Sequence, residues 1–358
     1  MLSIGNLKKW WFRSRSPVLL GIDISLSSVK VVELARLGDE LVLQGYANVP
    51  ILQQDSQNPA LSKIETMGMA VKKALRQVGT ELTHAVSAVP NASVITKVLK
   101  FPSELSDDEI AAQIELEAEH YIPYPINEVS LDFTLLDTTD HRDGFSDVLV
   151  VAARREQVED RAAILEWAGL RADIMDVDVL AMERALSRSE SVIGGNEGYA
   201  IVDAGASTTG FHVVKNGQVI FSREHNFGGR QLTEDIQRRY GLSPNEAELA
   251  KIRGGLPDSY EGEVLAPFID SMAQQIARAL FFFRSSHPGV RVDHMVFSGG
   301  CVALPGIEAY LDQIEGVRVV LANPFQAMSI HDRLDHSELE RVAPAMLTAT
   351  GLALRSFD

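Results

Sequence analysis

The stretch IVDAGASTT, residues 201–209, decides the fold that we expect. An apolar strand ends in Asp203 and runs into some of the smallest residues that a chain can use. Small residues bury little area, but they let the backbone approach a bound group closely. A carboxylate at the end of a strand needs a cation, a water or an N–H group. The stretch therefore predicts a turn built around a ligand, with contacts from Asp203, Gly205, Ala206, Ser207, Thr208 and Thr209.

A second copy of this pattern lies half a chain upstream, in VLLGIDISLSSVKVVEL at residues 18–34. Asp203 follows Asp23 by 180 positions, and Ser207 follows Ser27 by the same 180. In both copies a second strand comes after the turn, and the chain then turns back into a third strand. The later of these turns, Asn216-Gly217, is a strong hairpin signal. Two copies at a constant offset predict a duplicated α/β fold whose two loops face one cleft.

Two such loops suit a polyphosphate, because their N–H groups and hydroxyls can hold phosphate oxygens from both sides. Asp23 and Asp203 then face each other across a Mg²⁺ ion, through its waters, since Mg²⁺ keeps much of its hydration. In the first copy we expect phosphate contacts from Asp23, Ser25, Ser27 and Ser28. A third element, the strand at 292–298, ends in Ser298-Gly299-Gly300. Paired glycines let a purine lie on the backbone, and a simple strand-to-helix turn is the alternative.

The composition is that of a folded chain long enough for two domains, with 358 residues, 46% of them hydrophobic and 23% charged. The net charge of −16 argues against broad nucleic-acid binding, which needs a basic surface. The lone Cys301 excludes an internal disulfide and suits a reducing compartment. The sequence contains no run of about 20 apolar residues, so we expect no membrane-spanning helix. We expect a cytoplasmic protein.

Residues 1–16, MLSIGNLKKWWFRSRS, depart from this acidic average. They combine basic residues with tryptophan and phenylalanine and contain no acid. This mixture suits a membrane interface, where each basic residue contributes about 1 kcal/mol at an anionic surface. A disordered tail, or a helix docked on a partner, is the alternative. We expect peripheral membrane contact through residues 1–16.

The two acid-led loops and the late Gly-Gly turn resemble those of the actin and sugar-kinase ATPase superfamily, which implies ATP with Mg²⁺. The resemblance implies that Lys30, seven residues after Asp23, reaches the phosphates, although a solvent-facing strand residue is equally consistent. NFGGRQLTEDI (226–236) and NEAELAKI (245–252) are similar to the segments that flank ribose and adenine. The implied adenosine contacts are Gly228, Gly229, Glu248, Lys251, Ser298, Gly299 and Gly300. For Glu248 and Lys251, an ordinary exposed pair is the alternative.

Three further segments (105–133, 276–286 and 344–355) are similar to the PilM family of type IV pilus assembly, and the resemblance covers residues 17–357. It implies an ATP-binding adaptor, peripheral to the inner membrane, that grips the N-terminal tail of a PilN-type protein. Contacts with PilO- and PilC-type proteins, contacts with pilus ATPases, and self-association stay open. Ser25 departs from the family, which has glycine there. A positive φ would cost this serine about 1 kcal/mol; otherwise its hydroxyl adds a phosphate contact.

The resemblance to PilM and to the division protein FtsA implies an actin-like fold with an inserted subdomain. We expect the first actin-like domain at 17–90 and 173–198, the insert at 91–172 and the second domain at 199–358. Ser106 and Glu109 form a capping box that opens a helix over 106–121. The apolar, proline-rigid segment after it is expected to line the groove for the partner's extended peptide, with plain core packing as the alternative. The groove residues are Tyr121, Ile122, Tyr124 and Ile126.

The sequence lacks the common catalytic motifs. The sequence has no Walker A, G-x-S-x-G or H-E-x-x-H pattern. Hydrolysis of ATP needs a group that orients water, and the superfamily supplies it from a strand–helix junction that here contains Asp178. We expect an ATP-dependent scaffold with at most weak ATPase activity. An FtsA-like filament-forming protein and a sugar or carboxylate kinase are the alternatives, although no base for a sugar pocket is identifiable.

Overall fold

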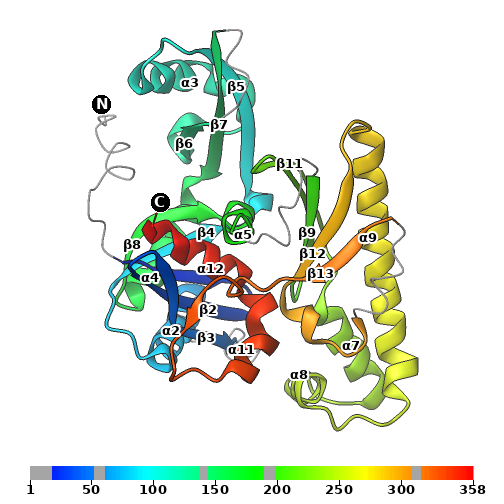
Figure 1. Cartoon of the computed structure of the whole chain (residues 1–358). Coiled ribbons are helices and arrows are strands. Elements are labelled where there is room, and N and C mark those ends of the chain that lie inside the picture. Colours follow the sequence, from blue (N-terminus) through cyan, green and yellow to red (C-terminus); the bar gives the residue numbers. More distant parts are fainter. Residues whose placement is uncertain (1–17, 52–60, 137–143, 189–197, 308–315, 358) are drawn as a thin grey trace.

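The computed structural model describes residues 18–51, 61–136, 144–188, 198–307 and 316–357 (Figure 1). These residues form a six-stranded, a five-stranded and a three-stranded sheet. The segment expected to touch a membrane, 1–16, lies outside the described residues. In the described ranges, no helix has both the length and the apolar composition that crossing a membrane requires.

The first sheet has the strand order β14-β3-β2-β1-β4-β8. Its strands are β1 (Leu20–Ile24), β2 (Ser28–Leu37), β3 (Glu40–Pro50), β4 (His84–Val89), β8 (Arg171–Val177) and β14 (Ser329–Ile330). Helices α2 (Lys63–Val78) and α4 (Arg155–Trp167) pack on one face, in the cluster that contains Val31. The neighbouring Val32 packs with the C-terminal helices α11 (His336–Val342) and α12 (Leu347–Leu354). Because successive strand residues point to opposite faces, these helices cover both sides of the sheet.

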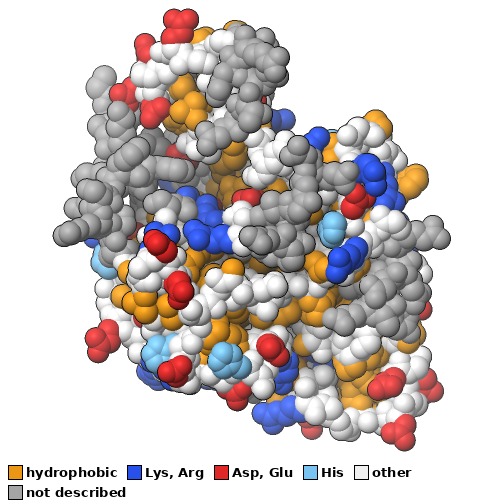
Figure 2. All heavy atoms as spheres, viewed as in Figure 1, with side chains coloured by type: hydrophobic (Ala, Val, Ile, Leu, Met, Phe, Trp, Pro, Cys, Tyr) orange, Lys and Arg blue, Asp and Glu red, His pale blue; other side chains and the backbone are white. Residues whose placement is uncertain are grey.

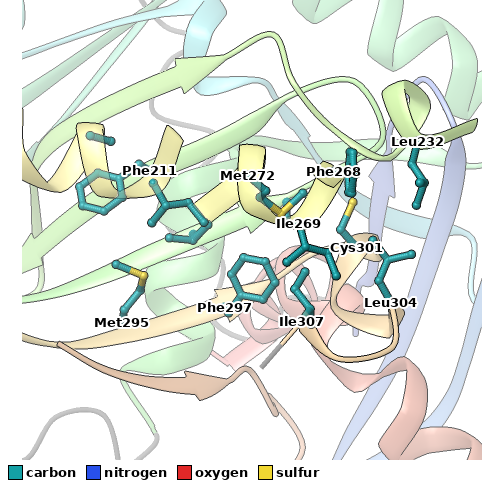
Figure 3. Close-up of a cluster of buried hydrophobic side chains, with 14 of the residues drawn as sticks. Phe211, Leu232, Phe268, Ile269, Met272, Met295, Phe297, Cys301, Leu304 and Ile307 are labelled. Carbon is teal, nitrogen blue, oxygen red and sulfur yellow. The ribbon is translucent and has the colours of Figure 1, made fainter. Parts of the chain in front are cut away.

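The second sheet has the order β11-β10-β9-β12-β13. Its strands are β9 (Gly198–Ala204), β10 (Thr209–Lys215), β11 (Gln218–His225), β12 (Val292–Ser298) and β13 (Arg318–Leu321). The associated helices are α7 (Gly229–Tyr240), α8 (Pro244–Arg253) and α9 (Ala266–Ser286). Figure 3 shows part of the core between this sheet and α9, where Phe211 and Phe297 lie beside Met272 and Ile269.

The predicted duplication is visible in the strand register. Asp23 pairs with Lys30 across β1 and β2, and Asp203 pairs with Gly210 across β9 and β10. These pairs, too, are 180 positions apart. A parallel strand lies on the other side of each central strand, β4 beside β1 and β12 beside β9. The duplicated α/β fold predicted from the two loops is confirmed.

The insert is a compact layer of one helix on one sheet. The sheet has the order β5-β7-β6, formed by β5 (Val94–Pro102), β6 (Val129–Leu135) and β7 (Phe145–Arg154). Helix α3 (Asp107–Tyr121) begins at the expected capping box, with Ser106 and Glu109 bonding each other's backbone N–H groups. Ile110 and Ile114 are buried against the sheet. Figure 1 shows the insert projecting away from the first sheet.

The domain boundaries differ from the expected ones at two places. Residues 329–357, assigned above to the second domain, add β14, α11 and α12 to the first sheet. Every residue of α12 is buried, and glycines allow its close approach: a Cβ at Gly351 would lie 1.7 Å from Ala181 O. Helix α4, assigned above to the insert, packs on α2 of the first domain, where Trp167 lies against Gly68.

Candidate nucleotide site

The two predicted phosphate loops close in the same way. In the first loop the N–H of Ser25 donates to Ser28 O at 2.9 Å, and in the second the N–H of Gly205 donates to Thr208 O at 2.9 Å. The duplication therefore extends from the strands to the hydrogen bond that closes each turn. Each loop follows a central strand, β1 or β9, at the end where that strand carries its aspartate.

The Ser25 hydroxyl is used within its own loop. It accepts from the N–H groups of Ser27, at 3.3 Å, and Ser28, at 3.1 Å, and it donates to Ser28 O at 3.0 Å. Ser25 has no positive φ, so the backbone strain considered for a serine here does not arise. The two N–H groups that would cradle a phosphate are instead bound to this hydroxyl.

The first residues of α7 hold the second loop through backbone hydrogen bonds. The N–H groups of Gly229 and Arg230 donate to Gly205 O, at 3.0 Å, and Ala206 O, at 2.7 Å. A Cβ at Gly228 would lie 2.5 Å from Gly205 O, so only glycine fits there. Ser207 Oγ is buried without a hydrogen-bond partner among the described residues. An unpartnered buried hydroxyl is costly, and a phosphate oxygen would satisfy it.

Thr209 and Cys301 have structural contacts instead. The Thr209 hydroxyl donates to Phe227 O at 2.8 Å, in a buried position. Cys301 Sγ lies 3.2 Å from Gly205 O, and burial raises the pKa of this thiol to about 12. The cysteine is therefore a neutral packing group behind the second loop.

One lysine serves the aspartates of both halves. Lys30 Nζ lies 2.8 Å from Asp23 Oδ2. Burial lowers the pKa of Lys30, but the attraction of Asp23, their hydrogen bond and the attraction of Asp203 together raise it. Burial also raises the pKa of Asp203, where Lys30 opposes the effect of Asp23 and Ser298 donates a hydrogen bond at 3.2 Å. Two acids and one lysine leave a negative site, which suits a divalent cation.

Asp178 is the first residue of α5 (Asp178–Leu186). It accepts hydrogen bonds from the N–H groups of Asn91, at 2.9 Å, and Val179, at 2.6 Å. Burial raises the pKa of Asp178 to about 8; these two bonds lower it, and the carboxylates of Asp203 and Glu224 raise it. The structure thus brings the candidate water-orienting group within electrostatic reach of Asp203.

Arg161 is a site residue that the sequence did not reveal. It lies on α4, and its Nη1 donates to Ile24 O, between Asp23 and Ser25 in the first loop. Burial lowers the pKa of its guanidinium, while Asp23, Asp178 and Asp160 oppose that shift. No motif surrounds Arg161, and 137 positions separate it from its partner.

The predicted adenosine contacts gather around the start of α7. Lys251 Nζ lies 2.7 Å from Glu248 Oε2 and 3.2 Å from Gly229 O. Thr233, which the sequence analysis missed, donates to Glu248 at 2.6 Å. Across the loop, Gly299 has a φ of 95°, and a Cβ there would lie 2.4 Å from Ala204 O. Above Gly300 a Cβ would meet nothing within 4 Å in the described part of the chain, which leaves space over the backbone.

Few side chains in the site are available to bind a metal ion. Within the described ranges, no group of three or more histidine, cysteine, aspartate or glutamate side chains is arranged to hold a metal ion. Asp23 and Asp203 would face a Mg²⁺ ion through its waters, as expected from the sequence.

The four expected groove residues do not share one surface. Tyr121 and Ile122 line a small apolar groove, with a cavity volume of only about 10 Å³, between α3 and the sheet of the insert, together with Ile95, Lys97, Leu99, Ile114, Ala118, Val150 and Ala152. Tyr124 is exposed and lies under the guanidinium of Arg154, at 4.7 Å. Ile126 packs in a small core with Ala118 and Val129. The groove opens beside β5, an edge strand of its sheet.

Comparison with known proteins identifies the family. Residues 21–357 match the family described as type IV pilus assembly protein PilM. The chain belongs to the PilM family. A solved PilM–PilN type IV pilus biogenesis complex aligns with 96% of this chain and 100% of its own, with a TM-score of 0.80 and 26% sequence identity. The resemblance to PilM inferred from three segments is confirmed.

More distant relatives share the fold of this PilM-family chain. FtsA of Enterococcus hirae is 22% identical over 87% of this chain and 80% of its own length. FtsA of Bacillus subtilis is 25% identical over 66% of the chain, which spans only 58% of that relative. Among solved structures, the ethanolamine utilization protein EutJ of Carboxydothermus hydrogenoformans and the archaeal actin homolog Ta0583 align with TM-scores of 0.51, at 16% and 12% identity.

Proposed function

We propose that this chain is an ATP-binding adaptor of type IV pilus assembly. In this role it binds the N-terminal cytoplasmic tail of a PilN-type inner-membrane protein and couples its nucleotide state to the assembly platform. The observation that carries the proposal is the match of nearly the whole chain to a PilM–PilN complex, insert included. The protein would then lie in the cytoplasm, at the inner membrane, with residues 1–16 available for contact with lipid.

The geometry of the two loops supports nucleotide binding. Two equivalent turns, a shared lysine, an unpartnered buried Ser207 hydroxyl and open space above Gly300 suit a triphosphate, a cation and a purine. The archaeal actin homolog of the same fold has been solved with ADP. When bound, ATP would supply the charge that bridges the two halves, with Asp23 and Asp203 facing Mg²⁺.

The insert supports peptide binding. Its groove has apolar walls but a volume of only about 10 Å³, so a tail that docks in extended form would lie mainly along β5, whose outer edge pairs with no other described strand. Figure 2 shows both acidic and hydrophobic side chains on the face of the insert that is in view. An apolar tail with basic residues would match both features.

Isothermal titration calorimetry on the full chain tests both parts. The titrants are Mg-ATP and a synthetic peptide of the N-terminal tail of the PilN-type protein from the same organism. We expect saturable binding of each, with one site per chain. Failure of the peptide to bind, with or without nucleotide, would exclude the adaptor role. Failure of Mg-ATP to bind would exclude the proposed nucleotide binding.

A filament-forming role is the second candidate, because FtsA relatives align with 87% of the chain. Sedimentation of the full chain with and without Mg-ATP distinguishes the two roles. A nucleotide-dependent pellet in the absence of the tail peptide favours filaments.

A further inference from the structure

The insert is attached to the body of the protein at two places, of which the first contacts the candidate nucleotide site and the second leads into a helix that contacts it. At the first, the turn Asn91–Ser93 precedes β5, and the N–H of Asn91 donates to Asp178 at 2.9 Å. The Asn91 side chain also donates to Ser222 Oγ of the second domain, at 2.7 Å. At the second, β7 ends at Arg154 and α4 begins at Arg155.

Helix α4 bonds to the insert at one end and to the first phosphate loop further along. Arg155 donates to Val129 O, at the start of β6 in the insert, at 3.3 Å. Six residues later on the same helix, Arg161 donates to Ile24 O in the loop. A helix rises 1.5 Å per residue, so about 9 Å of rigid backbone separates the two arginines.

The surroundings of Arg161 would change when a nucleotide binds. The acids that face it are Asp23 from β1, Asp178 from α5 and Asp160 from its own helix, and Lys30 pairs with Asp23. A bound Mg-triphosphate would place new charge beside these acids. A ligand shifts a conformational equilibrium only through its different interactions with the two states, and the charge at Arg161 provides such a difference.

We infer that Arg161 is a positioning residue that communicates occupancy of the first phosphate loop to the insert, and hence to the peptide groove. The inference rests on the proposed function, because it assumes a nucleotide at the loops and a peptide at the insert. The inference assigns the coupling to the guanidinium of Arg161 and to helix α4, which carries it. Asn91 provides the second contact, on Asp178.

The test measures coupling separately from binding. The affinity of the tail peptide is measured with and without Mg-AMP-PNP, and the affinity of Mg-AMP-PNP with and without the peptide. Coupling must be reciprocal, and allosteric factors of about 5- to 150-fold are typical. In the unaltered chain we expect the two ratios to agree and to exceed about 5.

The variants are Arg161→Gln and Arg161→Lys, with Arg171→Gln as the matched control. Arg171 is an exposed arginine at the far end of β8, paired with Asp173. We expect Arg161→Gln to bring the ratio close to 1 at Mg-AMP-PNP concentrations that saturate the variant. Arg161→Lys should restore part of the ratio, and Arg171→Gln should leave it unaltered.

Hydrogen exchange of residues 94–154 supplies a second readout that does not require the peptide. Nucleotide should slow exchange in the insert of the unaltered chain, and less so in Arg161→Lys. An unchanged ratio in Arg161→Gln, or the same exchange response in Arg161→Lys, would overturn the inference while leaving the proposed function intact. If the unaltered chain fails to bind either the nucleotide or the peptide, the proposed function is wrong, and this inference is wrong with it.

Discussion

Lys30 Nζ lies 2.8 Å from Asp23 Oδ2 and also attracts Asp203 from the other half of the molecule. The two aspartates occupy the same register position in two duplicated sheets, but only the first sheet has a lysine opposite its aspartate. In the second sheet that place is Gly210, where a Cβ would lie 2.5 Å from the His212 ring. The duplication has therefore produced two acids that share one cation, which makes the site asymmetric and favours binding of a further cation.

Removal of either acid should prevent tight binding of Mg-ATP. For Asp23→Ala and Asp203→Ala we expect affinity to fall by about 10- to 100-fold, because losing a hydrogen bond to a charged group costs about 1.5–3 kcal/mol and each 1.4 kcal/mol is tenfold. Calorimetry measures the affinity, and circular dichroism checks that each variant is folded. Addition of EDTA to the unaltered chain should have a comparable effect. Undiminished affinity in both variants would move the nucleotide away from these loops.

The stability of the protein should fall between pH 5 and pH 8 because of Asp178. Its pKa is about 8 in the folded state, against an ordinary value of 3.8, so the folded chain keeps a proton that the unfolded chain has lost. The free energy of unfolding therefore decreases as pH rises through this window. Asp178→Asn keeps an acceptor for Asn91 and Val179 but does not titrate.

Urea unfolding at pH 5 and pH 8 measures the Asp178 effect. We expect Asp178→Asn to gain stability relative to the unaltered chain at pH 8 and to show a smaller difference at pH 5. A difference that does not depend on pH would show that Asp178 is ionised in the folded protein.

A charge in the peptide groove should weaken binding of the PilN-type tail. Tyr121 lines the groove at the end of α3, whereas Leu116, on the same helix, is 82% exposed and does not line it. Tyr121 is 37% exposed in the free chain, so a docked tail would cover the charge of Tyr121→Glu, and peptide affinity should fall by about tenfold or more because a charge buried without a partner is costly. Leu116→Glu is the matched control and should bind normally.

Tyr124→Ala asks how far the peptide surface extends. Tyr124 lies outside the groove, under Arg154, but the sequence predicted it as a contact. Weakened binding in Tyr124→Ala would extend the surface to this side of the insert. Normal binding in both Tyr121→Glu and Tyr124→Ala would place the tail elsewhere on the molecule.

The two duplicated strand–turn units could be predicted from the sequence because each is local, and because the repeat at 180 positions made the second copy evidence for the first. The insert was also readable, since a capping box and alternating strands lie close together in the chain. The contact of Arg161 with the first loop could not be predicted, because a single arginine in a helix forms no motif and its partner, Ile24, is distant in sequence. The position of α12 was missed for a related reason: a helix that is apolar on every side does not indicate which sheet it covers.

The close packing of α12 should make Gly351 intolerant of a side chain. A Cβ there would lie 1.7 Å from Ala181 O of α5, which is backbone and cannot move alone. Gly351→Ala should therefore lower the free energy of unfolding by about 3 kcal/mol or more, above the usual range for overpacking. Gly289→Ala is the control, because no described heavy atom lies within 4 Å of that Cβ. Equal urea midpoints for the two variants would contradict the placement of α12 against α5.

Ser25→Ala distinguishes a hydroxyl that bonds only within its own loop from one that contacts a phosphate. In the structure Ser25 Oγ accepts from the N–H groups of Ser27 and Ser28, which are the groups that a phosphate would use. Removing the hydroxyl frees both donors, so we expect Mg-ATP to bind about three- to tenfold more tightly, given a net value of about 0.5–1.5 kcal/mol for one hydrogen bond. Ser103→Ala, an exposed serine of the insert whose hydroxyl bonds only Ser146 among the described contacts, is the control. Weaker binding in Ser25→Ala would show instead that the hydroxyl contacts the phosphate directly, and that the loop rearranges when nucleotide binds.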